Sequence, residues 1–194
     1  MSGRRLVRCI TVSTLYVEQP WTFLSLLARP HYRVEVFDER DVPVMVVRER
    51  SGPGVQRPLR HTGFSGWTTF DLDVVAPNGQ PIMGIEKGFG RRPHVRVTTP
   101  QGQLIGTIKT HGAWQQSLHD ATGQQLCFFG DVARIQTGAR AKRNGSRVRR
   151  DVVRINPAVT EPVRSLATAC AVAFDVVRGT GTSHTSSGGV DWPV

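Results

Sequence analysis

The sequence predicts a mainly β protein: a closed antiparallel β-barrel of about 12 strands around a buried hydrophobic C-terminal α-helix. Three observations lead to this prediction. Turn-forming glycines recur at a nearly constant spacing, apolar and polar residues alternate between them, and one segment near the C-terminus is apolar on almost every side. With 194 residues, 39% of them hydrophobic, the chain is long enough to bury a core as one domain.

The turns are the clearest signal. Gly79, Gly102, Gly123 and Gly145 follow one another at intervals of 23, 21 and 22 residues. Glycine accepts the positive φ that tight hairpin turns require. The runs beside these turns, such as FDLDVV, alternate between apolar and polar residues, and this period of two is typical of a half-buried strand. Each glycine therefore predicts one β-hairpin.

A fifth hairpin and one N-terminal stretch complete the strand count. The segment YRVEVFDERDVPVMVVR has the same alternation around a turn at 38–41 that lacks glycine. In the last hairpin, we expect 131–137 to pair with 147–155 across a long polar loop. Five hairpins give ten strands, and residues 6–17 add one or two more. Hairpins in series favour a meander or a barrel.

The segment 161–178, EPVRSLATACAVAFDVVR, predicts a helix. Ser165, Thr168 and Asp175 are the only polar residues in its middle, whereas a helix lying on a sheet would show one polar face. Its 18 residues would span about 27 Å, and its small side chains suit the inside of a barrel. The alternative is a helix packed on one sheet face or used in a dimer. We expect 1–178 to form one domain and the Gly/Ser/Thr-rich 179–194 to form a flexible tail.

The order of these hairpins and the terminal helix resembles the Tubby C-terminal-like superfamily, in particular its phospholipid scramblase and LURP-one-related branch. The matching stretches are FDLDVVAPNGQPIMGIEKGFG, VRVTTPQGQLIGTIKTHGAWQQSLHDATGQQLCFFGD and EPVRSLATACAVAFDVV. The resemblance covers most of 10–178 and implies a twelve-stranded barrel around the helix. It also implies a membrane-associated role, because Tubby-like domains bind phosphoinositides on a basic surface and scramblase-like members are linked to lipid movement.

Two departures from the scramblase pattern argue against calcium-dependent scrambling. The segment DVVRINPAVTE, which precedes the helix, has no series of aspartates, and a calcium site needs several carboxylates close together. The cysteine cluster that scramblases use for lipidation is also missing. A phospholipid scramblase therefore remains only an alternative function.

Charge points to an anionic partner. The chain has 25 Lys and Arg against 15 Asp and Glu, a net charge of +10 and a pI near 10.9. Residues 134–154 include eight basic residues and a single acid, Asp151. Such a patch would attract anionic phospholipid or phosphate ligands, or nucleic acid. The stretch has no interleaved aromatic residue, which weakens the nucleic-acid alternative, and a merely solvated hairpin is the third interpretation. The candidate ligand-binding residues are Arg140, Lys142, Arg143, Arg147, Arg149 and Arg150.

Signals for catalysis, metals and cofactors are weak, so we expect a non-enzymatic protein without cofactor or metal. GFSGW at 63–67 lacks the pattern of a nucleophile elbow, and GFG at 88–90 does not open a helix as a dinucleotide site would. His111 and His119 fall on separate predicted strands, and we do not expect them to converge. Three scattered cysteines and no secretory signal favour a cytoplasmic location, with peripheral contact to a membrane as an option. No transmembrane span is predicted, and the oligomeric state is unknown.

Overall fold

The computed structural model describes residues 13–20, 32–50, 67–90, 94–111 and 115–178. Three of the sequence predictions, for the stretch 6–12, for most of GFSGW and for the tail 179–194, lie outside these residues. The elements in chain order are β1 (Thr14–Pro20), β2 (Arg33–Phe37), β3 (Pro43–Glu49), β4 (Phe70–Val75), β5 (Pro81–Lys87), β6 (Val95–Thr98), β7 (Leu104–His111), β8 (Gln115–Asp120), β9 (Gln125–Phe128), α4 (Phe129–Val132), β10 (Ala133–Arg143), β11 (Ser146–Ile155), α5 (Val163–Val172) and α6 (Phe174–Val177).

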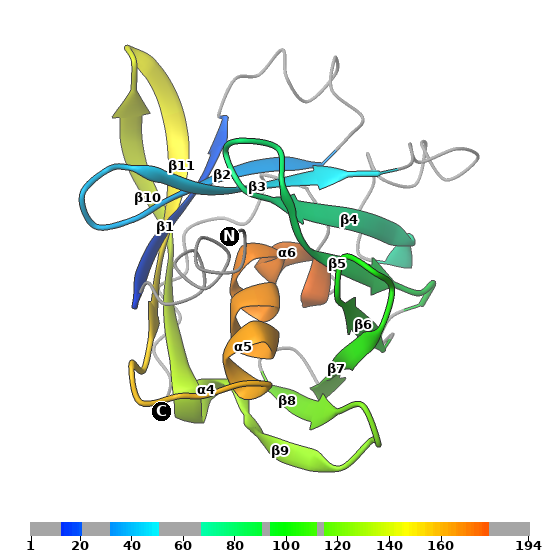
Figure 1. Cartoon of the computed structure of the whole chain (residues 1–194). Helices are drawn as coiled ribbons and strands as arrows, with labels where there is room; N and C mark the ends of the chain where they lie inside the picture. The colour runs from blue at the N-terminus through cyan, green and yellow to red at the C-terminus, as the bar shows by residue number, and fades with distance from the viewer. Residues whose placement is uncertain (1–12, 21–31, 51–66, 91–93, 112–114, 179–194) are drawn as a thin grey trace, which may run out of the picture.

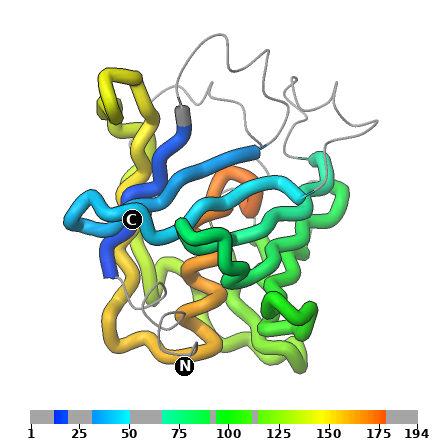
Figure 2. The backbone as a smooth tube through the Cα atoms, turned by 45° about the horizontal axis from the view of Figure 1, so that its top comes forward, coloured from blue at the N-terminus to red at the C-terminus, as the bar shows by residue number. Residues whose placement is uncertain are grey.

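All the strands of the described residues belong to one antiparallel sheet. In this part of the chain the sheet has 11 strands, in the order β10-β11-β1-β2-β3-β4-β5-β6-β7-β8-β9. From β1 to β9 each strand pairs with the next one along the chain. The exception is β11, which returns to pair with β1 in a register that sets Thr14 opposite Arg154. Figures 1 and 2 show this sheet curving strongly around the C-terminal helices.

The predicted turns are confirmed. All four hairpin glycines have positive φ, between 79° and 88°. The turn at 38–41 is also present, and Asp41 supplies its positive φ of 64°. The last hairpin differs from its prediction. In place of a long polar loop, β10 and β11 continue to a short turn at Asn144 and Gly145. The direct pairing of Arg143 with Ser146 shows this.

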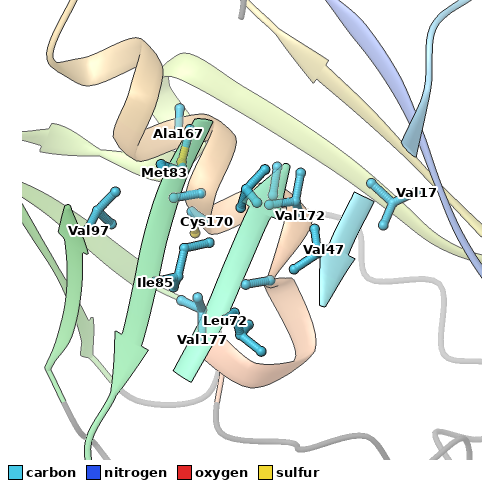
Figure 3. Packing of buried hydrophobic residues seen from close by; sticks show 14 of the residues in the cluster. Val17, Val47, Leu72, Met83, Ile85, Val97, Ala167, Cys170, Val172 and Val177 are labelled. Carbon is cyan, nitrogen blue, oxygen red and sulfur yellow. The ribbon is translucent and has the colours of Figure 1, made fainter. Parts of the chain in front are cut away.

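The C-terminal helix is buried, as its apolar sequence predicts. Residues 164–172 of α5 are all buried, and Ala167, Cys170 and Val172 have no exposed surface. Figure 3 shows these side chains among apolar residues of the strands, such as Leu72 and Ile85. This helix therefore fills the concave side of the sheet, and burial raises the pKa of the Cys170 thiol.

The helix is shorter than predicted and is broken. It begins at Val163 rather than at 161, and α5 ends at Val172. Ala173 leaves the helical region, with φ −112° and ψ 25°, and α6 then continues to Val177. The break changes the direction of the chain before Asp175, whose carboxylate contacts side chains of β1 and β11.

The sheet is not closed. In the described residues no ladder joins the two edge strands, β9 and β10, and the short helix α4 connects them along the chain. α4 contacts β8, β9 and β10 and so lies at the gap between the edges. The mainly β architecture with an interior helix is present, but the predicted barrel closure is not confirmed.

Candidate anion-binding surface

The six predicted basic residues lie on the β10–β11 hairpin, but they do not form one surface. Residues that face each other across an antiparallel pair point to the same side, and successive residues along a strand point to opposite sides. Lys142 is opposite Arg147 and Arg140 is opposite Arg149. Arg150 is opposite Ala139 and therefore points to the other side of the hairpin. The predicted 140–150 loop is thus two paired strands with its basic side chains on both sides, and their role in ligand binding stays a prediction.

Arg143 is held by carboxylates on the outer side of the sheet. Its Nε donates to Oε2 of Glu18 at 2.9 Å, and its Nη2 donates to Oδ1 of Asp41 at 2.8 Å. The guanidinium also stacks on the Phe37 ring, 3.9 Å from its centroid. Arg143 lowers the pKa of Asp41 by donating this hydrogen bond. Arg143 therefore ties the hairpin to β1 and to the turn at 38–41.

Arg150 shares the same carboxylate. Its Nε donates to Oε1 of Glu18 at 2.8 Å, and its guanidinium lies 5.2 Å from the ring centroid of Tyr16. The side chain of Glu18 is only 3% exposed, whereas those of Arg143 and Arg150 are 21% and 25% exposed. One buried glutamate thus binds two arginines and fixes the hairpin against β1.

Arg149 lies on the core-facing side and is also paired. Its two terminal nitrogens each donate to Asp175 at 3.3 Å, and Nη2 is 3.4 Å from Oδ2 of Asp151. Gln19 donates to Asp175 from β1 at 3.2 Å. Burial raises the pKa of Asp151 to about 6, although Arg149 opposes this shift. This buried cluster joins β1, β11 and α6.

The remaining three predicted residues, Arg140, Lys142 and Arg147, are exposed. Lys142 and Arg147 face each other across the hairpin, and neither forms an ion pair with any of the described residues. Figures 1 and 2 show the tip of this hairpin standing clear of the rest of the sheet. These three residues, called the hairpin tip below, make up the accessible part of the predicted patch.

The fold reduces the charge that the sequence suggests. Residues 134–154 carry eight basic side chains and one acid, a formal +7. The structure brings three more acids, Glu18, Asp41 and Asp175, against this hairpin, so the formal charge of the assembled region is +4. Glu18 is 125 residues from Arg143 in the sequence, and no local pattern could have identified this pair.

The structure contains a histidine–serine chain that the sequence did not indicate. His111 and His119 were not expected to converge, but both contact the Ser117 hydroxyl, at 2.6 Å and 2.9 Å. The register of β7 and β8, which sets Lys109 opposite Ser117, causes the convergence. Nδ1 of His119 lies 3.1 Å from the carbonyl oxygen of Gly123. Ser117 has no exposed surface, so this chain links two strands and does not offer an accessible nucleophile.

The described part of the chain contains no cluster of three or more His, Cys, Asp or Glu residues arranged to hold a metal ion. Among the helices of the described residues, none has the length and apolar character needed to cross a membrane. Comparisons with protein-family models, with curated proteins and with solved structures found no match to this chain.

Proposed function

We propose that this protein is a non-enzymatic module that binds anionic phospholipid, or a related phosphate ligand at a membrane surface, through the hairpin tip. The observation that carries the proposal is the pair Lys142 and Arg147. Like charges directly opposite each other on antiparallel strands are destabilising, and no carboxylate among the described residues neutralises this pair. An anionic surface would supply the missing negative charge.

The expected strength follows from the number of exposed cations. Near an anionic leaflet each basic residue contributes about 1 kcal/mol, so Lys142 and Arg147 together contribute about 2 kcal/mol. This corresponds to a difference of about thirtyfold in affinity. Because the attraction falls off within a Debye length, the binding should weaken as the salt concentration rises.

The test is vesicle flotation with phosphatidylcholine alone and with added phosphatidylserine. The Lys142→Gln/Arg147→Gln variant should lose most of the binding that depends on phosphatidylserine. Arg33→Gln/Arg48→Gln is the matched control, because these two arginines are also exposed and also face each other, on β2 and β3. This control removes the same charge from another part of the sheet and should bind nearly as the wild type does.

Other outcomes would contradict the proposal. Equal losses in both variants would mean that net charge, rather than the hairpin tip, attracts the protein to vesicles. Salt-sensitive binding to DNA without any preference for anionic vesicles would favour the nucleic-acid alternative. Lipid movement in proteoliposomes would favour a scramblase. Barrel closure and the Tubby-like assignment remain predictions from the sequence, and the proposal does not depend on them.

A further inference from the structure

A polar pocket lies at the opposite end of the β10–β11 hairpin from the hairpin tip. Its volume is about 410 Å³, and it is lined by the start of β1, by α4, by the start of β10 and by the end of β11 with the turn that follows. This volume falls in the lower part of the range of pockets that take small molecules. The lining is rich in polar side chains, and two of them are arginines, Arg134 and Arg154.

The two arginines face each other directly. Arg134 is opposite Arg154 in the β10–β11 register, so both side chains point to the same side of the hairpin. Both side chains are exposed, and neither side chain forms an ion pair or a hydrogen bond with the described residues. This sets them apart from Arg143, Arg149 and Arg150 of the same hairpin, which all contact carboxylates.

The acid that lines the pocket does not neutralise them. Asp131 contributes to the wall, but its Oδ2 accepts a hydrogen bond from the backbone N–H of Phe128 at 3.2 Å. No ion pair joins Asp131 to either arginine within the described residues. With two cations and one acid, the wall keeps a formal positive charge.

The backbone around the pocket is held in place. The N–H of Ile155 donates to the carbonyl oxygen of Ser13 at 2.7 Å, and the N–H of Asn156 donates to that of Val132 at 2.9 Å. The side-chain oxygen of Asn156 accepts from the N–H of Ala158 at 3.0 Å. Because its oxygen is engaged in this way, Asn156 can offer its amide N–H groups as donors. The pocket thus combines two guanidinium groups with an amide donor on a hydrogen-bonded frame.

We propose that this pocket binds the phosphate group of a small phosphorylated molecule, with Arg134 and Arg154 as its two cationic ligands. The planar guanidinium matches the geometry of phosphate oxygens and can donate two parallel hydrogen bonds to them. A bound phosphate also removes the repulsion between the two facing arginines. This site is separate from the hairpin tip and does not depend on a membrane.

The test uses inorganic phosphate as the probe, followed by NMR of the labelled full-length protein. Phosphate should cause saturable shifts of the backbone amide signals of Gly130 and Asn156, which line the pocket. Chloride at the same ionic strength should not. The Arg134→Gln/Arg154→Gln variant should bind phosphate at least about tenfold more weakly. It loses the charge-assisted hydrogen bonds of both guanidinium groups, and a bond of this kind contributes enough free energy to change the affinity about tenfold.

The matched control is Lys142→Gln/Arg147→Gln, which removes two facing cations from the other end of the same hairpin. It should change phosphate affinity by less than about twofold, because exposed charges that lie farther than a Debye length from the pocket are largely screened by salt. If the double arginine variant does not fold, Arg154→Gln alone replaces it and should still weaken binding measurably.

The proposal is overturned if the shifts do not saturate, if chloride reproduces them, or if both double variants lose affinity equally. The two proposals can fail separately. Loss of vesicle binding in the hairpin-tip variant with retained phosphate shifts supports both sites. Saturable phosphate binding without any vesicle binding keeps the pocket and refutes the membrane role of the hairpin tip.

Discussion

Glu18→Gln is the substitution that best tests how the hairpin is fixed to the sheet. The change keeps the size of the side chain but removes its charge, and it puts an amide N–H₂ where one of the two acceptor oxygens was. Glu18 accepts hydrogen bonds from Arg143 and Arg150, so both arginines lose their shared carboxylate. We expect a clear loss of stability.

The size of the loss follows from burial. Removing one partner of a buried ion pair costs about 3–5 kcal/mol. Glu18 is 3% exposed, but Arg143 keeps Asp41 and both arginines retain some solvent contact. The lower end of the range, about 3 kcal/mol, is therefore expected. In a protein of this size that corresponds to a fall of about 6–12 °C in Tm.

Thermal and urea unfolding followed by circular dichroism would measure this loss. Glu35→Gln is the matched control, because Glu35 lies directly opposite Glu18 on β2 and bonds to Arg33. Its side chain is 46% exposed, and we expect its replacement to change stability by less than about 0.5 kcal/mol. Equal effects of the two substitutions would refute the assignment of Glu18 as the residue that fixes the hairpin.

Three further predictions concern the core. Burial raises the pKa of Asp151 to about 6, so the folded protein binds a proton that the unfolded chain releases near pH 4. As the pH rises from about 4 to 6, the free energy of unfolding should therefore fall by up to about 3 kcal/mol because of Asp151. The Asp151→Asn variant should lack this part of the pH dependence in urea titrations. Gly106→Ala should cost more than about 2 kcal/mol by denaturant unfolding, because its Cβ would meet the His119 carbonyl oxygen, whereas Gly130→Ala, with open space around it, should change little. Leu166→Ala, in the fully buried part of α5, should cost about 2–5 kcal/mol in the same assay.

Much of the fold could be predicted because its signals are local. The positive φ at each hairpin turn restricts the residue type, and the glycine spacing therefore located four turns correctly. The tip of the last hairpin was mistaken for a loop, because it extends beyond the core and burial imposes no apolar alternation there. Barrel closure would need pairing between the two edge strands, β9 and β10. No local sequence pattern indicates whether two such strands pair.

For the candidate site, the sequence predicted which basic residues are present but not which of them remain exposed. The sequence correctly placed the basic residues on one hairpin, but it did not show which of them the fold would neutralise. That depends on the pairing of β11 with β1, which brings Glu18 to Arg150 across 132 positions, and on the helix break that brings Asp175 to Arg149. Arg134 and Arg154 lay inside the same basic run, but the pocket that they line became visible only in the structure.

The most direct test of the proposed function is the affinity for vesicles with and without phosphatidylserine, measured for the wild type, Lys142→Gln/Arg147→Gln and Arg33→Gln/Arg48→Gln. We predict that the wild type and the β2–β3 control bind anionic vesicles alike, and that the hairpin-tip variant is released. Equal binding by all three proteins, or binding that ignores phosphatidylserine, would contradict the role assigned to the hairpin tip.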